Sequence, residues 1–332
     1  MRRVSQCMII FIKQAAMRTL YRALLCVAFA IVCSPNTFAQ SKDDGVLRIL
    51  AVGNSFSDDG TEYIPALLAN LGVKNVEIAR LYVGGCSLKQ HTDFYKKGES
   101  PYIYTTSKAG ENRWTEQSKH HSLKAALAEG EWDIITLQQR SGDSGIYSSF
   151  EPYLGELITI IKQAQPNARI AWHMTWSYST NSRHNDFARY ERSSQKMLEA
   201  IYDATHAATE AHPEIEIIIP CGTAIQSLRQ SAINNSPRDL TRDGYHMGEG
   251  AGRYALACTW YEELIEPYTN ISMVGNTLRV NKGSVNVSPI VATYCQRAAR
   301  MAVRHNFTIR EVKHVGREMR RAKRGNKEKI IE

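Results

Sequence analysis

The residue types that a serine needs for ester cleavage occur in two short motifs that lie far apart in the chain. Ser55 lies in Gly53-Asn54-Ser55, and Asp243 and His246 lie three residues apart in Asp243-Gly244-Tyr245-His246. Serine catalysis needs a hydroxyl nucleophile, an imidazole that accepts its proton and an acid that orients the imidazole. A turn can present Asp243 and His246 towards one point, with the carboxylate behind the ring. We therefore predict that Ser55, His246 and Asp243 form a catalytic triad.

The same reaction needs N–H donors for the negative charge that develops on the carbonyl oxygen. The backbone N–H of Ser55 can face the reacting group at the start of a helix. The backbone N–H of Gly85, in Gly84-Gly85-Cys86-Ser87, is not obstructed by a side chain. Gln138 or Gln139 can add a side-chain amide, and the sequence does not decide between them.

The hydrophobic pattern indicates how the fold brings these residues together. Short runs rich in Ile, Val and Leu lie at 46–52, 76–83, 133–137, 168–174 and 215–219. Nearly continuous hydrophobicity is typical of parallel strands that are covered on both faces. With amphipathic stretches between the runs, the sequence predicts an α/β fold: a three-layer αβα sandwich with a mainly parallel, flavodoxin-like sheet of about five strands.

Helices are expected at about 61–71, 115–129, 150–164, 186–211, 222–233 and 249–264, then a hairpin at 271–281 and a helix at 287–304. In parallel sheets the reactive groups gather beyond the carboxyl ends of the strands. Ser55, Gly85 and Gln138 follow the first three runs closely, and Asp243 lies past the fifth. The spacing thus predicts one site at one edge of the sheet.

The motifs, in this order, resemble those of the SGNH (GDSL-like) hydrolase superfamily. The resemblance covers about 46–265 and implies a nucleophile at Ser55, an oxyanion glycine at Gly85 and a final Asp-x-x-His at Asp243 and His246. Asn54 stands where the family has Asp, and Gln138-Gln139 stands in place of the family's Gly-x-Asn. The chain looks most similar to uncharacterised exported SGNH-like proteins of Bacteroidetes. This similarity implies a serine esterase that acts on glycan esters.

Possible substrate contacts lie beside these motifs. Trp176 and Tyr178 follow the fourth run, where a sugar ring could stack, although core packing is an equal expectation. Asn54 and Tyr245 lie within the motifs themselves. His120, His121 and His184 have no partner at metal-ligand spacing, so we expect no metal, and the serine mechanism needs no other cofactor.

The net charge of +8 belongs to the two ends of the chain. Residues 1–39 contain five Lys/Arg and no acid, and residues 313–332 contain eight Lys/Arg and three Glu, so 40–312 carries about −2. An apolar run at 23–33 follows Arg18 and Arg22, which predicts a signal peptide over 1–39 that starts at Met1 or Met17. Anchoring of a lipoprotein through Cys33 is the weaker alternative, because Val32 is a poor fit before it.

The remaining chain divides into a hydrolase domain at 40–310 and a basic tail at 311–332. Four cysteines, Cys86, Cys221, Cys258 and Cys295, remain after cleavage of the leader, and sequence cannot choose among their three pairings. Buried free thiols are the default in a domain that does not need disulfides for stability.

The sequence therefore predicts an exported, periplasmic or extracellular, serine esterase that removes small acyl groups, chiefly acetyl, from carbohydrate. The alternatives are a lipid esterase or thioesterase of the same fold and an inactive glycan-binding protein. The expected partner is a small-molecule or glycan ester. Neither nucleic acid nor a stable membrane span is expected, and the oligomeric state is not specified by the sequence.

Overall fold

The computed structural model describes residues 44–312. The signal peptide predicted for 1–39, and the basic tail predicted for 311–332 except its first two residues, lie outside the described residues. Within 44–312, no helix combines the length and the apolar character that a membrane span requires.

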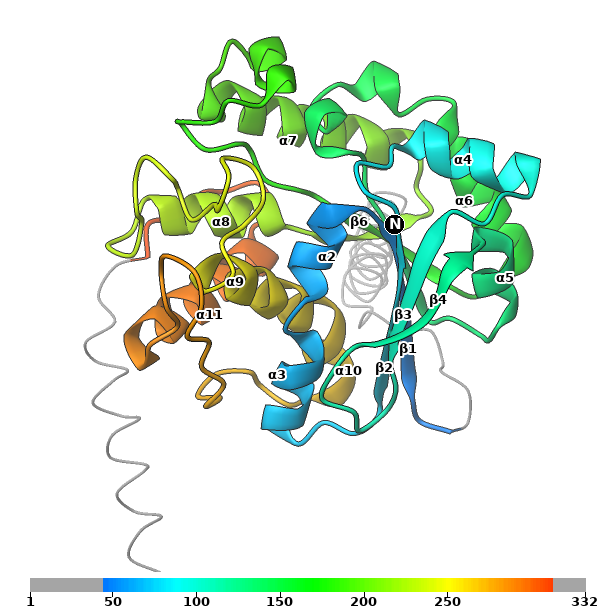
Figure 1. The fold of residues 1–332 in the computed structure, drawn as a ribbon, viewed down its shortest axis with the longest axis horizontal. Coiled ribbons are helices and arrows are strands. Elements are labelled where there is room, and N and C mark those ends of the chain that lie inside the picture. The colour runs from blue at the N-terminus through cyan, green and yellow to red at the C-terminus, as the bar shows by residue number, and fades with distance from the viewer. Residues whose placement is uncertain (1–43, 313–332) are drawn as a thin grey trace, which may run out of the picture. The chain divides into compact units, whose positions relative to one another are not determined.

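The centre of the fold is a seven-stranded sheet in the order β4-β3-β2-β1-β5-β6-β7 (Figure 1). The strands are β1 (Leu47–Gly53), β2 (Val76–Tyr82), β3 (Tyr102–Ser107), β4 (Thr115–His121), β5 (Ile134–Leu137), β6 (Arg169–His173) and β7 (Ile215–Ile219). All neighbours from β2 to β7 pair in parallel. The parallel part has the flavodoxin-like order, in which the chain switches direction next to β1. The predicted αβα fold with a mainly parallel sheet is confirmed.

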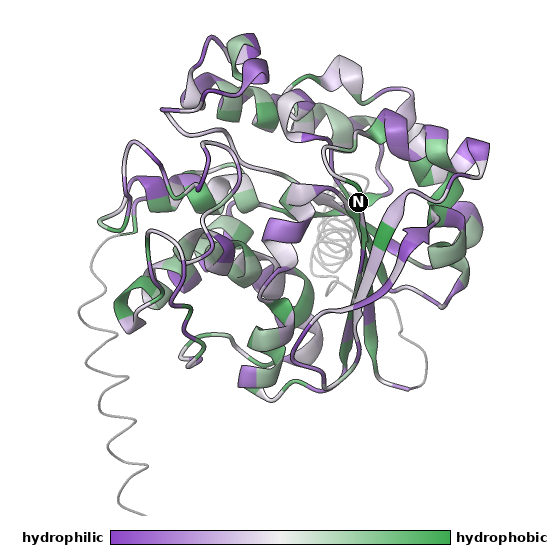
Figure 2. Ribbon diagram, in the orientation of Figure 1, coloured by the Kyte–Doolittle hydropathy of each residue, from purple (hydrophilic) through white to green (hydrophobic). Residues whose placement is uncertain are grey.

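Two of the seven strands were not predicted. β3 and β4 form an antiparallel hairpin that extends the sheet from β2. β4 occupies the first half of the helix predicted at 115–129, and only α5 (Leu123–Ala128) is helical there. The β4 sequence, TEQSKHH, has no apolar residue and is mostly exposed, so no period of hydrophobicity marks it. Polar residues suit an edge strand because they discourage pairing with another chain, and the hairpin carries hydrophilic segments in Figure 2.

Helices cover both faces of the sheet (Figure 1). One layer contains α2 (Ser55–Thr61), α3 (Ile64–Leu71), α8 (Cys221–Arg229), α9 (Ala251–Trp260) and α11 (Pro289–Arg304). The other contains α4 (Leu88–Lys97), α5, α6 (Tyr153–Ala164) and α7 (Ser194–Ala211). α9 continues through a π-helical turn (Tyr261–Ile265) into α10 (Glu266–Thr269). The predicted hairpin at 271–281 is wrong, because these residues form no strand.

A few other expected helices differ from the structure at their ends. The expected helix at 186–211 begins as a 3-10 turn, Asn185–Tyr190, before α7. The expected helix at 61–71 corresponds to α3, and a further helix, α2, precedes it and starts at Ser55. The nucleophile candidate therefore opens a helix directly after the first strand.

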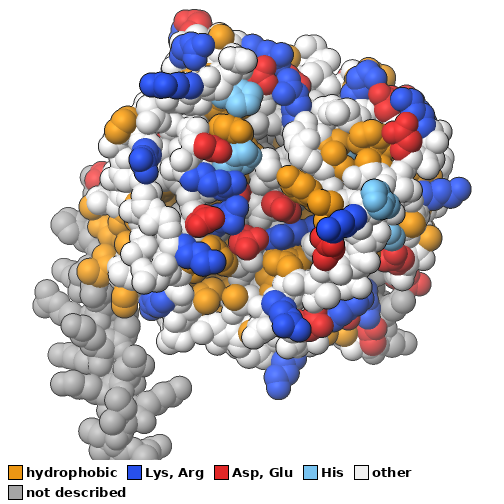
Figure 3. Space-filling model, viewed as in Figure 1, with side chains coloured by type: hydrophobic (Ala, Val, Ile, Leu, Met, Phe, Trp, Pro, Cys, Tyr) orange, Lys and Arg blue, Asp and Glu red, His pale blue; other side chains and the backbone are white. Residues whose placement is uncertain are grey.

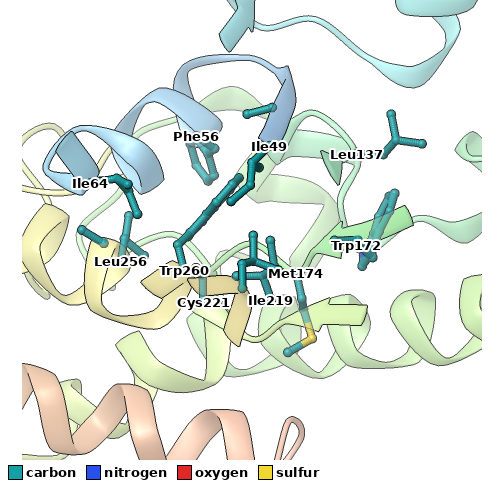
Figure 4. Close-up of a cluster of buried hydrophobic side chains, with 14 of the residues drawn as sticks. Ile49, Phe56, Ile64, Leu137, Trp172, Met174, Ile219, Cys221, Leu256 and Trp260 are labelled. Atoms are coloured by element: carbon teal, nitrogen blue, oxygen red, sulfur yellow. The ribbon is translucent and has the colours of Figure 1, made fainter. Parts of the chain in front are cut away.

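Aromatic side chains pack the first turn of α2 against the core (Figure 4). Phe56 of α2 is buried with Ile49 of β1 and Trp260 of α9. The Phe56 ring stacks on the ring of Trp176, with centroids 4.1 Å apart and planes 4° apart. Burial of a Phe side chain is worth roughly 1.5–3 kcal/mol. Because Phe56 follows Ser55 directly, this packing limits the freedom of the turn that carries the hydroxyl.

The start of α8 lies directly against the backbone that follows β6. Gly222 N donates to Met174 O at 3.0 Å. A Cβ atom on Gly222 would lie 2.3 Å from Thr175 O, which is far inside van der Waals contact. Only glycine permits this approach of helix and strand.

Replacement of Gly222 by Ala should therefore destabilise the protein. The added methyl group must displace backbone on one side, and overpacking of this kind costs about 1–3 kcal/mol in the free energy of unfolding. Urea unfolding followed by circular dichroism measures the change. Gly130→Ala is the matched control, because a Cβ there has no neighbour within 4 Å and should change little. Equal stability of the two variants would contradict the close approach at Gly222.

Candidate active site

The structure brings Ser55, His246 and Asp243 together in one hydrogen-bonded chain. Ser55 Oγ lies 2.8 Å from His246 Nε2, and His246 Nδ1 lies 2.6 Å from Asp243 Oδ2. A carboxylate only accepts hydrogen bonds, so Nδ1 carries the hydrogen and Nε2 accepts the one from Ser55. Asp243 Oδ1 also accepts the N–H of His246 at 2.8 Å, which fixes the carboxylate relative to the ring. This arrangement can take a proton from the Ser55 hydroxyl.

The loop that carries Asp243 and His246 is held by the segment that follows β6. Trp176 Nε1 donates to Tyr245 O at 2.7 Å, and Ser179 N donates to Gly244 O at 2.9 Å. Gly244 has φ +98°, a conformation that favours glycine. The Asp-x-x-His spacing therefore works because Gly244 permits the turn and the 176–179 segment binds its carbonyls.

Asn54 organises the strand-to-helix turn that carries Ser55. Its side chain is buried, and Oδ1 caps α2 by accepting from Phe56 N at 3.0 Å. Nδ2 donates to Cys86 O at 2.9 Å, in the loop after β2. Asn54 thereby joins the turn that carries Ser55 to the glycine loop, and its side chain is buried in these contacts, whereas the sequence suggested that it contacts substrate.

The glycine loop is a tight turn. Cys86 N donates to Val83 O at 3.2 Å, and Gly85 has φ +63°. Gly84 and Gly85 are exposed, whereas Cys86 is buried. The Gly85 N–H thus lies in an accessible loop that Asn54 ties to the start of α2.

Gln138 and Gln139 are bound inside the protein, which disagrees with the expected oxyanion contact. Gln138 Nε2 donates to Asn54 Oδ1 at 2.7 Å, and its Oε1 accepts from His173 Nδ1 at 2.8 Å. Gln139 Nε2 donates to the O and Oγ atoms of Ser149, both at 3.1 Å. Each glutamine is only 1% exposed. Their amides are thus used to hold the loops after β5.

Of the expected aromatic contacts, only Tyr245 keeps an accessible surface. Trp176 and Tyr178 are fully buried, so they belong to the core, the alternative that the sequence also allowed. The Tyr245 ring is partly exposed and lies 4.0 Å from the His246 ring and 4.8 Å from the His184 ring, between centroids. Tyr245 and His184 therefore form an aromatic wall beside the hydrogen-bonded chain.

The ionisable groups of the site have shifted pKa values. Burial raises the pKa of Asp243, but hydrogen bonds from the His246 side chain and backbone outweigh it and lower the pKa to about 2. Desolvation lowers the pKa of His173 to about 3, so this histidine is neutral and donates from Nδ1 to Gln138. His173 is therefore a core histidine whose Nδ1 has a hydrogen-bond partner.

Cys86 is a poor rival nucleophile in this structure. Its Sγ lies 3.5 Å from His91 Nδ1, but both side chains are buried. Desolvation raises the pKa of Cys86 to about 12 and lowers that of His91 to about 4, so the pair is neutral. A thiol without thiolate character is a weak nucleophile. Cys86, Cys221, Cys258 and Cys295 are all buried and free, in agreement with the default expectation.

Among the described residues, no cluster of three or more His, Cys, Asp or Glu could hold a metal ion. Charged side chains of both signs are interspersed over the face shown in Figure 3. That face therefore has no large patch of one sign that would attract a polyanion.

Two parts of the site were not foreseen from the sequence. The role of His173 as a hydrogen-bond donor to Gln138 depends on the pairing of β5 with β6, which places their ends side by side. Asp59, one helical turn after Ser55, is buried beneath the 241–247 loop. The only sequence signal for it was its spacing of four residues from Ser55.

Comparison with known proteins supports the fold. A family described as a domain of unknown function, DUF4886, matches residues 48–295. A crystal structure of a DUF4886 family protein from Bacteroides uniformis is 33% identical, covers 80% of this chain and 98% of its own, and has a TM-score of 0.72. Among curated proteins, none matches the sequence.

Weaker matches include members of the superfamily that the motifs resemble. A putative SGNH hydrolase from Slackia heliotrinireducens is 19% identical over 66% of this chain and 98% of its own, with a TM-score of 0.46. A putative GDSL-like lipase from Parabacteroides merdae is 14% identical over 68% and 97%, with a TM-score of 0.44. At these scores neither protein bears on the chemistry of this one. The match over 48–295 and the identity to the Bacteroides uniformis protein show that the chain belongs to the DUF4886 family.

Proposed function

We propose that this chain is a serine ester hydrolase in which Ser55 is the nucleophile, His246 the general base and Asp243 the acid that orients it. The observation that carries the proposal is the continuous chain of hydrogen bonds from Ser55 Oγ through the imidazole to Asp243. The low pKa of Asp243 supports this role, because the carboxylate stays ionised and stabilises the imidazolium that forms.

In the first half of the reaction, Ser55 Oγ attacks the ester carbonyl carbon and its proton moves to His246 Nε2. The carbon–oxygen bond to the alcohol then breaks, and His246 returns the proton to the leaving alcohol. In the second half, His246 Nε2 takes a proton from water as the water oxygen attacks the acyl carbon on Ser55. The bond between Ser55 Oγ and the acyl carbon then breaks, His246 returns the proton to Ser55 Oγ, and the carboxylic acid leaves.

Backbone donors stabilise the oxyanion in this proposal. The Ser55 N–H at the start of α2 and the Gly85 N–H in the exposed glycine loop are joined through Asn54, which fixes the two donors relative to each other. Removal of one such donor in serine hydrolases costs roughly 10²–10³ in kcat. Gln138 and Gln139 are not included, because their amides are bound elsewhere.

The proposed substrate is a short acyl ester, chiefly acetyl, on a carbohydrate outside the cytoplasm. Among residues 44–312, the exposed large hydrophobic side chains are Ile271, Val274 and Ile290. None of them belongs to the segments that carry the triad, so an extended groove for a long acyl chain has no support. The partly exposed Tyr245 ring offers a face on which a sugar can pack. Export follows from the leader predicted over 1–39.

Replacement of Ser55 by Ala should abolish turnover. The nucleophile is lost while the alanine still fits the helix start, so kcat for an aryl acetate should fall by roughly 10⁴-fold or more. Labelling by a fluorophosphonate probe should disappear as well. Thermal unfolding checks that the fold is retained.

Ser57→Ala is the matched control for this test. Ser57 lies two residues away in the same helix, and its buried hydroxyl plays no part in the mechanism. This variant should keep both labelling and turnover. If S55A turned over ester at the wild-type rate, Ser55 would not be the nucleophile.

The substrate proposal predicts a preference for short acyl groups. Rates of hydrolysis should fall along a series of aryl esters from acetyl to octanoyl, because no apolar groove holds a longer chain. Acetate release from acetylated oligosaccharides should exceed release from acetylated lipids. A preference for octanoyl esters or lipids would instead favour the lipid esterase or thioesterase.

The depressed pKa of Asp243 predicts how stability depends on pH. A carboxylate whose pKa is lower in the folded state stabilises the fold above its unfolded pKa, and this contribution is lost as the pH falls through the folded pKa. Wild type should therefore be more stable than Asp243→Asn above about pH 4, and the difference should shrink as the pH falls towards 2. Urea unfolding of both proteins at pH 5 and at pH 3 tests this, and a difference that does not change with pH would contradict it.

A further inference from the structure

Asp59 is a buried carboxylate that the proposed mechanism does not use. It lies in α2 four residues after Ser55, so both side chains lie on the same face of the helix, one turn apart. Its side chain is 1% exposed. A buried carboxylate is costly unless it is paired, so its partners indicate what it holds in place.

The partners of Asp59 lie at the base of the hairpin that presents Asp243 and His246. This hairpin, residues 241–247, is closed by a β-bridge between Thr241 and Met247 and by a hydrogen bond from Arg242 N to His246 O at 3.0 Å. Asp243 and His246 lie inside these closing contacts. Movement of the base must therefore move both residues relative to Ser55.

The carboxylate contacts both strands of this base. Met247 N donates to Asp59 Oδ2 at 2.8 Å, and Arg242 Nη1 donates to Oδ1 at 2.9 Å. Arg253 Nε reaches the same Oδ1 at 2.8 Å from α9. The two oxygens thus accept from donors of three residues, a set that an amide cannot satisfy because its nitrogen would face a donor.

We propose that Asp59 is a positioning residue that sets the distance between Ser55 Oγ and His246 Nε2, and this role rests on the function proposed above. Ser55 to His246 and Asp59 to Met247 are two successive contacts between α2 and the hairpin. The hydrogen bond between Ser55 and His246 forms only when the hydrogen bond between Asp59 and Met247 holds the hairpin against α2. On its other side the hairpin is tied by Trp176 and Ser179, so loss of Asp59 leaves the hairpin folded but free to shift.

The alternative is a purely structural role, in which Asp59 joins α2 to α9 through Arg253 and supplies a counter-charge for two arginines. Both roles predict that Asp59→Asn lowers the melting temperature. The two roles differ in their predictions for kcat. The positioning role predicts that loss of Arg242 lowers kcat more than loss of Arg253, whereas the purely structural role predicts no such difference. Arg242 belongs to the hairpin and Arg253 to α9, yet both bind the same oxygen.

The test compares Asp59→Asn, Arg242→Met and Arg253→Met. Methionine keeps an unbranched side chain and removes the donors in the same way at both arginines. We expect D59N and R242M to lower kcat for an aryl acetate by about 10- to 100-fold with little change in KM, the effect of a misplaced catalytic group. R253M should lower the melting temperature and retain most of the kcat.

Crystal structures of D59N and R242M supply a readout that does not depend on activity. The Ser55 Oγ–His246 Nε2 distance should exceed hydrogen-bond range in these variants and stay near 2.8 Å in R253M. If wild type hydrolysed no ester, the function would fail while the distances still tested the positioning. An unchanged distance in D59N and R242M, or a kcat that follows the melting temperature equally in all three variants, would overturn the proposal.

Discussion

The arrangement of the site depends on three hydrogen bonds of the buried Asn54 side chain. Asn54 caps α2 through Phe56 N, holds the loop after β2 through Cys86 O and accepts from Gln138 after β5. Gln138 in turn accepts from His173 at the end of β6. One buried network thus joins the ends of four neighbouring strands. In a parallel sheet these ends open towards the site, so the network fixes the surface from which Ser55 and Gly85 project.

Separate sets of contacts hold the proposed acid–base pair, Asp243 and His246, and the proposed nucleophile, Ser55, in place. Ser55 and the glycine loop are held by the network around Asn54, whereas Asp243 and His246 lie on a hairpin that Asp59 binds on one side and Trp176 and Ser179 on the other. The hydrogen bond between Ser55 and His246 is the point at which the two supported parts meet. The Ser–His distance therefore depends on both supports, although neither support touches the reacting atoms.

Much of this site could be predicted because its reactive residues form short motifs next to strand ends. The type and spacing of Ser55, Asp243 and His246 were sufficient to place these three side chains together. The partners of the amides could not be predicted, since Gln138 and Gln139 are alike in sequence and only the pairing of β5 with its neighbours directs one to Asn54 and the other to Ser149.

Asp58 and Asp59 are equally alike in sequence. Helical phase places Asp59 under the hairpin and leaves Asp58 partly exposed beside Arg80. β4 was missed because an exposed edge strand has no apolar period.

The two differences from the superfamily pattern, Asn54 for Asp and Gln138-Gln139 for Gly-x-Asn, form one arrangement in this structure. A carboxylate at position 54 could accept from Phe56 N and Gln138 Nε2, but it has no hydrogen for Cys86 O and would place charge against a carbonyl oxygen. The amide does both, because its oxygen faces two donors and its nitrogen faces the acceptor. Gln138 is long enough to reach between Asn54 and His173, so its amide completes this network. The replacement of the superfamily's Asp by Asn54 is therefore not neutral. The amide of Asn54 determines how the glycine loop is attached to the turn that carries Ser55.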